Sequence, residues 1–323
     1  MSTRKDCDYL MLSAAVRTRE NKALTIKRRE QLLESKDIES SARILSECGY
    51  GELESADAQG VEKLIGSKRA EMYDFLRMLM SGHEILQYFT LRYDYHNAKV
   101  LLKGGEERLL LPLGRIPTEK LEEAFARNDF RTLPHTFASA AESARTKLHE
   151  SGDAHGADLL LDAAMLEEKR ILSGQSEMLR HYCTLEIDLY NFRTAVRLHR
   201  MGAETEQIRP LMVSGGAVNP NAISAAQGSA WEELTRGSRL DAVGKEASKA
   251  AARKSLTAFE CACDDALSAL LDGSRNKAFG EEVVISYIAG CEAEFTAVRT
   301  ILLGQLAHLP VSEIRTRLRR AYY

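Results

Sequence analysis

The clearest pattern in the chain is a set of apolar positions that recurs in three separate segments. Each segment contains one acidic residue, Asp94 in the first, Asp188 in the second and Glu294 in the third. In all three, apolar side chains stand three residues before the acid and one, four, seven and eight residues after it. These offsets follow one face of an α-helix. The pattern therefore predicts three equivalent amphipathic helices that share one register.

Polar positions recur in the same register. An amide or a small residue stands three residues after each acid, and a base stands five residues after it. These positions are held by Asn97 and Lys99, by Asn191 and Arg193, and by Ala297 and Arg299. Residues three apart are neighbours on a helix surface, so Asp94 and Asp188 each lie beside an asparagine. Three interpretations stay open: hydrogen-bonding nodes between helices or repeats, contacts with a partner, or surface residues inherited by duplicated bundles.

Signals for helix starts and stops recur after each segment. A proline within the first turn fixes φ without removing a helical hydrogen bond. Pro117, Pro220 after Asn219, and Pro310 stand in front of apolar helical patterns. Thr25, ahead of Ile26 and the pair Leu32 and Leu33, is a candidate cap of an equivalent helix. Stops between helices are predicted at Gly104 and Gly105, at Gly202, and at Gly215 and Gly216.

The spacing of the segments predicts the domain organisation. The acids are 94 and 106 residues apart, whereas solenoid repeats have periods of about 20–50 residues. Each unit is therefore expected to be a small helical bundle. We predict an all-α fold of three similar bundles, covering residues 1–115 with an opening helix, 116–217 and 218–323. The best strand candidate, residues 108–113, contains a proline and is interpreted as an extended linker.

Composition narrows the classes of function. The chain has 323 residues, 44% hydrophobic and 28% charged, with a net charge of −3. This balance does not favour nucleic acid as a partner, because nucleic-acid binding usually requires a basic field. The longest stretch without charges, residues 210–231, is rich in glycine and polar residues and contains prolines, so no membrane span is predicted. The charged N-terminus lacks the apolar region of a secretory signal.

The sequence gives little indication of a catalytic or metal-binding site. Asp264 and Asp265 are adjacent, whereas two carboxylates that share a metal on a helix should be four residues apart. A solvated helix face is the favoured interpretation. The eight histidines have no metal-binding spacing, and the six cysteines form no C-x-x-C pair, which favours reduced thiols. The sequence contains no phosphate-binding loop. We expect no catalytic residue, cofactor or metal.

The C-terminal segment gathers four arginines: Arg315, Arg317, Arg319 and Arg320. Cations near the C-terminus of a helix interact favourably with its dipole, so these residues could simply stabilise a helix. They could equally form a docking edge for an acidic partner. The sequence leaves both interpretations open.

Several segments resemble the C subunits of V-type and archaeal-type ATP synthases, a family related to the eukaryotic d subunits. Residues 287–306 (YIAGCEAEFTAVRTILLGQL) and 309–319 (LPVSEIRTRLR) are similar to its C-terminal signature. Residues 95–103 (YHNAKVLLK) and 188–193 (DLYNFR) resemble its two internal signatures, and residues 9–14 (YLMLSA) resemble its opening helix. The matches follow the expected order along nearly the whole chain, although Ala297 departs from the asparagine of the first two segments.

The resemblance implies three helical bundles arranged as a funnel-like socket with approximate three-fold pseudosymmetry. It implies a non-catalytic central-stalk rotor subunit, one copy per complex, peripheral on the cytoplasmic face of the membrane. Its partners would be the central-stalk axle subunits and the membrane proteolipid ring. It would transmit torque that couples ATP synthesis or hydrolysis to proton or sodium ion transport. Two alternatives are a soluble all-helical scaffold or adaptor unrelated to rotary motors, and a helical enzyme with a site of an unfamiliar kind.

Overall fold

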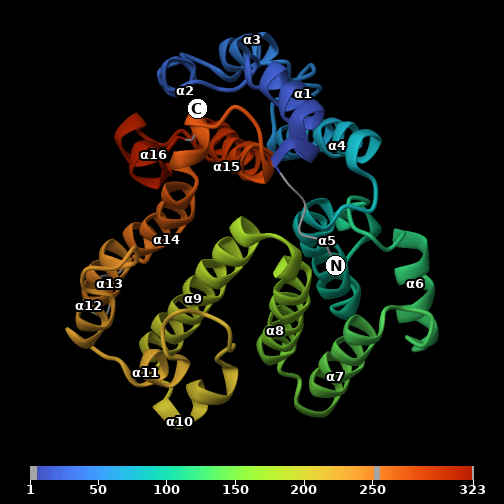
Figure 1. The fold of residues 1–323 in the computed structure, drawn as a ribbon, viewed down its shortest axis with the longest axis vertical. Helices are drawn as coiled ribbons and strands as arrows, with labels where there is room; N and C mark the ends of the chain where they lie inside the picture. The colour runs from blue at the N-terminus through green and yellow to red at the C-terminus, as the bar shows by residue number, and fades with distance from the viewer. Residues whose placement is uncertain (1–5, 251–254, 322–323) are drawn as a thin grey trace. The chain divides into compact units, whose positions relative to one another are not determined.

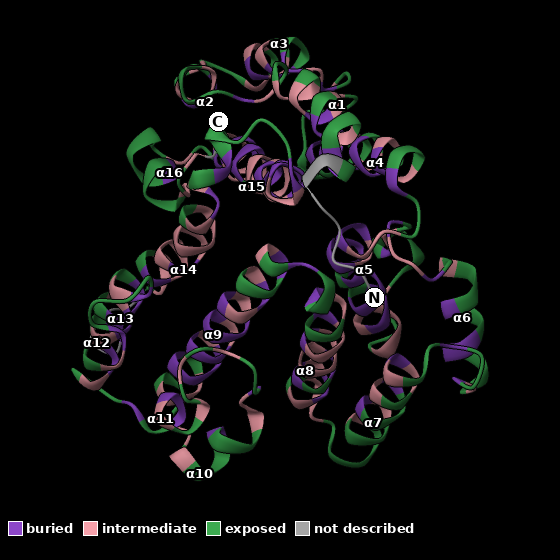
Figure 2. Ribbon diagram, viewed as in Figure 1, coloured by how far each residue is buried: buried purple, intermediate pink, exposed green. Residues whose placement is uncertain are grey.

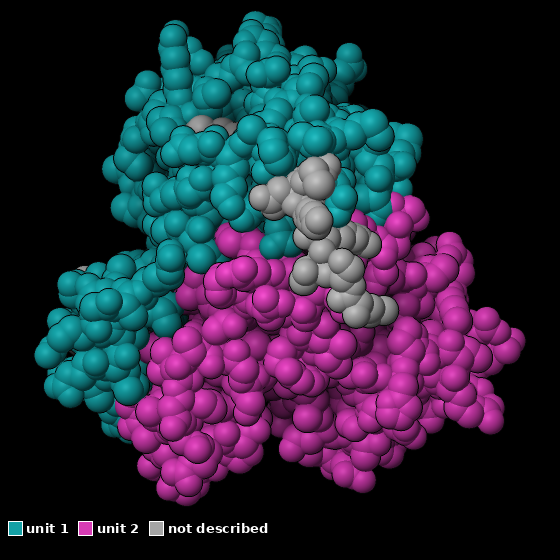
Figure 3. Space-filling view, viewed as in Figure 1, with its two compact units in different colours: residues 1–80, 227–323 teal, residues 81–226 magenta. Residues whose placement is uncertain are grey.

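The computed structural model describes residues 6–250 and 255–321, and every regular element in these ranges is a helix (Figure 1). The predicted all-α class is confirmed. The described residues form two compact units (Figure 3). Unit 1 comprises residues 1–80 and 227–323, and unit 2 comprises residues 81–226. Unit 1 is therefore built from the two ends of the chain.

Unit 2 is built on two long helices that carry the first two acids. Its elements are α5 (Glu84–Leu102), η2 (Glu107–Leu109), α6 (Thr118–Arg127), α7 (His135–Ser151), α8 (Ala154–Leu172), η3 (Ser173–Gln175), α9 (Glu177–Arg200), α10 (Thr205–Ile208), η4 (Arg209–Leu211) and α11 (Pro220–Ala225). The α7–α8 hairpin packs on α5, and Tyr95 of α5 meets the buried ring of Phe137 edge-on with centroids 5.1 Å apart. Aromatic pairs favour this geometry, so the contact fixes α7 on α5.

Unit 1 is organised around one long helix. Its elements are η1 (Asp6–Tyr9), α1 (Leu10–Glu20), α2 (Ile26–Leu33), α3 (Ile38–Glu47), α4 (Ala58–Met80), α12 (Ala230–Thr235), α13 (Asp241–Ala250), α14 (Thr257–Leu270), η5 (Asp272–Asn276), α15 (Glu281–Leu306) and α16 (Val311–Arg317). Helices α1, α3, α4 and α16 all pack on α15. Because α15 is covered on several sides, its sequence is apolar around most of its circumference and its buried positions extend beyond one stripe (Figure 2).

The predicted helix starts are confirmed. Pro117 stands directly before α6 and Pro310 directly before α16. Asn219 caps α11, because its side chain accepts a hydrogen bond from the backbone of Asn221 at 2.9 Å. Thr25 caps α2 in the same way, accepting from the N–H of Arg28 at 3.3 Å. These caps satisfy backbone donors that have no partner within the helix.

The predicted stops are confirmed in part. Gly104 and Gly202 follow α5 and α9 with φ of +65° and +82°, the left-handed conformation that ends many helices. Gly215 and Gly216 do not end a helix. They lie in the loop between η4 and α11, where the requirement for Gly216 is steric.

The segment predicted to be an extended linker, residues 108–113, begins within the short helix η2, is extended at Leu110 and turns at Pro112 and Leu113. The prediction therefore holds only in part. The structure places no strand there or elsewhere in residues 6–250 and 255–321. None of the helices in these two ranges combines the length and the apolar character that crossing a bilayer requires.

Candidate functional site

The first recurring acid ties the loop before α6 to helix α5. Asp94 is fully buried in the second half of α5. Its Oδ1 accepts a hydrogen bond from the backbone N–H of Ile116 at 2.9 Å, and its Oδ2 accepts from Nε of Arg115 at 3.1 Å. Ile116 stands directly before Pro117, the residue that precedes α6. The carboxylate therefore fixes the place where α6 begins.

The second acid makes the equivalent contact in α9. Asp188 is buried, and its Oδ1 accepts from the N–H of Val218 at 3.0 Å while its Oδ2 accepts from the N–H of Ala217 at 2.9 Å. Val218 stands directly before Asn219, the cap of α11. The two acids thus hold equivalent positions of two different loops. Ile116 and Val218 each stand two residues before the first residue of the next helix.

The recurring amides hold the same loops at a second point. Asn97 donates from Nδ2 to the carbonyl of Leu111 at 2.9 Å and accepts at Oδ1 from the N–H of Leu111 at 2.8 Å. Asn191 makes the same pair of bonds with Val213, both at 2.8 Å. Each amide satisfies both backbone groups of one loop residue, as a neighbouring strand would.

Two glycines allow these loops to approach the acids. A Cβ atom on Gly114 would lie 2.1 Å from Oδ1 of Asp94, and one on Gly216 would lie 2.1 Å from Oδ1 of Asp188. Each glycine stands two residues before the residue whose backbone N–H donates to Oδ1. Any side chain at either position would push the loop away from the carboxylate.

The third acid makes the corresponding contact with a loop from the other end of the chain. Glu294 of α15 accepts at Oε2 from the N–H of Leu24 at 2.8 Å and at Oε1 from the hydroxyl of Tyr50 at 2.8 Å. Leu24 stands directly before Thr25, the cap of α2. The residue two positions before Leu24 is Lys22, where the other loops have glycine, and the acid is longer by one methylene. We infer that the longer side chain lets the acid reach a loop that has a lysine where the others have glycine.

We call these three contacts the acid joints: Asp94 with residues 114–116, Asp188 with residues 216–218, and Glu294 with Leu24. Each acid has its own loop, so the three do not share one cluster. Burial raises the pKa of all three carboxyl groups, and the hydrogen bonds they accept only partly offset that effect. Burying these carboxylates therefore costs free energy of desolvation. Their hydrogen bonds in turn fix the position of a loop on a helix.

The recurring bases lie nearer the surface, and two of them pair with neighbouring helices. Lys99 forms an ion pair with Asp162 of α8, with Nζ 2.5 Å from Oδ1. Arg299 contacts both carboxylate oxygens of Glu62 on α4, at 2.6 and 2.5 Å. Arg193 is half-buried on α9. The pairs that Lys99 and Arg299 form each connect a helix that carries an acid joint to an adjacent helix.

A second group of glutamates was missed by the sequence interpretation. Glu186 accepts from the hydroxyl of Tyr88 and from Nζ of Lys169, both at 2.6 Å. Glu292 accepts from the hydroxyl of Tyr73 at 3.1 Å and faces Arg69 at 3.3 Å. Both glutamates stand two residues before the acid of their segment, so the shared register carried a signal that could have revealed them.

Glu168 belongs to the same group but stands outside that register. It lies on α8 and accepts from the hydroxyl of Tyr95 at 2.7 Å and from Arg115 at 2.8 Å. Arg115 therefore bridges Glu168 and Asp94, the acid of the first joint. Nothing in the linear pattern connects these residues.

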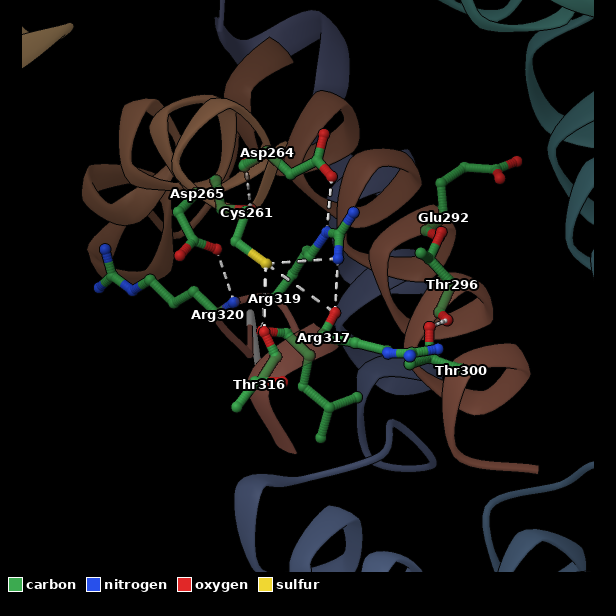
Figure 4. Close-up of polar contacts among 12 residues, drawn as sticks. Cys261, Asp264, Asp265, Glu292, Thr296, Thr300, Thr316, Arg317, Arg319 and Arg320 are labelled. Atoms are coloured by element: carbon green, nitrogen blue, oxygen red, sulfur yellow. Dashed lines mark hydrogen bonds and ion pairs between the residues drawn. The ribbon is translucent and has the colours of Figure 1, made fainter. Parts of the chain in front are cut away.

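The four C-terminal arginines each have an acidic partner within the chain. Figure 4 shows one of these pairs, Arg319 with Asp264. The pairs are Arg315 with Glu30 at 2.6 Å, Arg317 with Glu313 at 2.6 Å, Arg319 with Asp264 at 2.7 Å, and Arg320 with Asp272 at 2.8 Å. Helix α16 ends at Arg317, so Arg319 and Arg320 lie beyond its last turn. The helix-dipole interpretation therefore applies only to Arg315 and Arg317. The docking edge stays a prediction.

The two adjacent acids and the thiols also have defined places. Asp264 pairs with Arg319, and Oδ1 of Asp265 accepts from the backbone N–H of Arg320 at 2.6 Å. In the part of the chain that the structure describes, no group of three or more metal-binding side chains is placed to hold an ion. The cysteines found there are reduced thiols: Cys48, Cys183, Cys261, Cys263 and Cys291. The side chain of Cys7 lies outside the described residues.

Comparison with known proteins gives one consistent result. The model of the ATP synthase (C/AC39) subunit family matches residues 12–317. The C subunit of the A-type ATP synthase of Methanocaldococcus jannaschii is 26% identical over 96% of this chain and 86% of its own length. The C subunit of the V-type sodium ATPase of Enterococcus hirae is 23% identical over 98% and 99%. The C subunit of the V-type ATP synthase of Thermus thermophilus is 29% identical over 60% and 64%. The family match includes all three acid joints.

Proposed function

The chain belongs to the ATP synthase (C/AC39) subunit family, and from that premise we propose that it is the non-catalytic rotor subunit of a V-type or A-type ATP synthase. In this role it joins the central axle to the membrane ring of proteolipids. The observation that carries the proposal is the family match over residues 12–317, which covers both compact units. Its partners are then the axle subunits and the ring. Its place is peripheral, on the cytoplasmic face of the membrane, through those partners.

The proposed task is mechanical, and the acid joints support it. A subunit that carries torque must be rigid at the loops that connect one helix to the next. At each joint the loop before a helix is held by hydrogen bonds to a carboxylate that is buried or half-buried. Pivoting the loop would break hydrogen bonds to that carboxylate, which costs about 1–3 kcal/mol or more for a charged group. Apolar contacts alone would let the same loop slide at a smaller cost.

The joints also support a three-fold repeat of the architecture. The same contact recurs in three helices, and in each case the loop residue lies one position ahead of the residue that precedes the next helix. We propose that three similar bundles correspond to these joints. Because Glu294 holds Leu24, the third bundle includes the N-terminal loop and α2 in addition to residues 218–323.

The proposal is tested by removing this chain from the assembled ATPase. The catalytic head lies in other chains, so ATP hydrolysis should continue while ATP-driven ion transport into vesicles stops. Adding the purified chain back should restore transport. Transport that persists without the chain would refute the rotor role, as would failure of a tagged chain to co-purify with axle and ring subunits.

A further inference from the structure

The C-terminal segment of unit 1 is held mainly by polar contacts, whereas the helices around it are held by apolar packing. We call residues 311–321 the C-terminal strap; it consists of α16 and residues 318–321, which follow it without regular secondary structure. Ile314 is the one side chain of α16 that is buried, and it sits against Gly304 of α15. A Cβ on that glycine would lie 2.7 Å from Cγ1 of Ile314. One apolar side chain is a small anchor for a segment of this length.

Polar contacts hold the strap to α14 and η5. Nε of Arg319 is 2.7 Å from Oδ2 of Asp264, and the backbone N–H of Arg320 donates to Asp265 at 2.6 Å. The guanidinium of Arg320 reaches Asp272 at 2.8 Å. Figure 4 shows Arg319 lying across α14 between Asp264 and Cys261. The footprint of the strap on this side is a row of carboxylates.

Polar contacts also hold the strap to α2, at the other end of the chain. Arg29 donates to the carbonyl of Arg319 at 2.7 Å, and Arg315 pairs with Glu30 at 2.6 Å. Nε of Arg29 is buried without a hydrogen-bond partner, and burial lowers the pKa of this guanidinium. The strap therefore runs between α2 and α14 and contacts both mainly through charged groups.

We propose that the C-terminal strap is a latch held by charged groups. It fastens the N-terminal helix α2 to α14, and it opens as a unit while the rest of unit 1 remains folded. Helix α15 is buried along its length, whereas the strap has one buried apolar side chain and ion pairs that are partly exposed. Salt weakens exposed ion pairs and hardly affects a buried apolar core. This inference rests on the contacts alone and does not depend on the proposed function.

Cys261 provides a built-in reporter of the latch. Its Sγ lies 3.7 Å from the carbonyl of Thr316 and 3.4 Å from Nη1 of Arg319, so the closed strap partly covers it (Figure 4). Burial raises the pKa of this thiol, and Arg319 opposes that effect. Replacing Arg319 should therefore make the thiol intrinsically less reactive. Faster alkylation in an Arg319 variant can then only report greater exposure.

The test measures the alkylation rate of each cysteine in the full chain with iodoacetamide, followed by peptide mass spectrometry. Rates are compared at low salt and at about 1 M NaCl, where the screening length falls to roughly 3 Å. A free cysteine peptide corrects for the effect of salt on the reaction itself. The variants are Arg319→Asp, Asp264→Arg and the two together. Arg299→Asp is the matched control, because it makes the same charge change against Glu62 of the same unit and leaves the strap intact.

We expect high salt and Arg319→Asp to raise the Cys261 rate by at least about twofold, within the range that one partly exposed ion pair contributes. Asp264→Arg should raise the rate as well, but it also removes an acid that raises the pKa of the thiol, so Arg319→Asp is the variant that decides. The swapped pair should return the rate toward that of the unmodified chain, and Arg299→Asp should leave it unchanged. A Cys261 rate that ignores salt and both single variants would overturn the latch. So would a parallel rise at the buried thiols Cys48 and Cys263, because that result would mean that the core opens with the strap.

Discussion

Replacing Gly216 by alanine tests the acid joint at the point where it is tightest. The new Cβ would lie 2.1 Å from Oδ1 and 2.9 Å from Cγ of Asp188. An ordinary contact needs about 3.4 Å, so the loop or the carboxylate must move by about 1 Å. That movement stretches the bonds from Ala217 and Val218, now 2.9 and 3.0 Å, beyond hydrogen-bond distance.

The cost follows from what the movement leaves behind. Asp188 is only 1% exposed, so water cannot readily replace the lost donors. A hydrogen bond to a charged group contributes about 1.5–3 kcal/mol, and two are at risk. We expect Gly216→Ala to lower the free energy of unfolding by about 3–5 kcal/mol, allowing for partial relaxation.

The matched control is Gly174→Ala in the same unit. A Cβ at Gly174 meets no atom within 4 Å, and its φ lies outside the left-handed region. Alanine there should be neutral or stabilise by up to about 1 kcal/mol, because it restricts the unfolded chain. Urea unfolding followed by circular dichroism compares the two variants, and hydrogen exchange at α11 locates the damage.

A double-mutant cycle separates the clash from a general intolerance of the loop. In an Asp188→Ala background the carboxylate is absent, so the further effect of Gly216→Ala should shrink to below about 1 kcal/mol. If Gly216→Ala and Gly174→Ala differ by less than about 1 kcal/mol in the original background, the loop yields easily. The joint would then not be the rigid contact inferred from the distances.

Three further predictions follow from the other joint residues. Asn97→Ala should lower the free energy of unfolding by about 2–4 kcal/mol, because both backbone groups of Leu111 lose their partner; urea unfolding measures this. Since burial raises the pKa of Asp188, the folded state binds a proton more readily than the unfolded state. The stability of the unmodified chain relative to Asp188→Asn should therefore rise as pH falls from neutrality to about 4, and an opposite slope in paired urea titrations would contradict the shift. Glu294→Asp should accelerate hydrogen exchange in α2, because the shorter acid cannot reach Leu24, and adding Lys22→Gly should restore part of the protection.

The local elements could be predicted from the sequence because they depend on neighbours in the chain. The apolar offsets located the helices around Asp94, Asp188 and Glu294, and the caps at Thr25 and Asn219 marked helix starts. Such signals act within one or two turns, so periodicity and capping chemistry report them directly.

The loop residues that bind the recurring acids and asparagines could not be predicted, because the loops differ in length. Leu111 lies 14 residues after Asn97, whereas Val213 lies 22 residues after Asn191, yet both make the same bonds. An alignment at fixed spacing does not reveal that correspondence. Leu24 is 270 residues from Glu294, and only the folded unit brings them together.

The end of α16 was hidden for a different reason. The helix stops at Arg317 and Leu318 is already extended, without a glycine to mark the change. The sequence therefore could not show that Arg319 and Arg320 lie beyond the helix and pair with acids of α14 and η5.

The third joint also explains why the repeated polar pattern breaks where it does. In the first two joints a chain-continuous loop must return to its own helix, and glycine, acid and amide together hold it at two points. At Glu294 the loop comes from the N-terminal helices, which α15 already holds through its packing against α1 and α3. The second polar contact comes from another position of α15, because Gln305 donates to the carbonyl of Leu32 in α2 at 2.9 Å, and Ala297 is buried where the others have asparagine. The departure from the repeat therefore marks the place where the two ends of the chain meet. The acid is retained there because apolar packing alone does not fix the position of a loop along a helix.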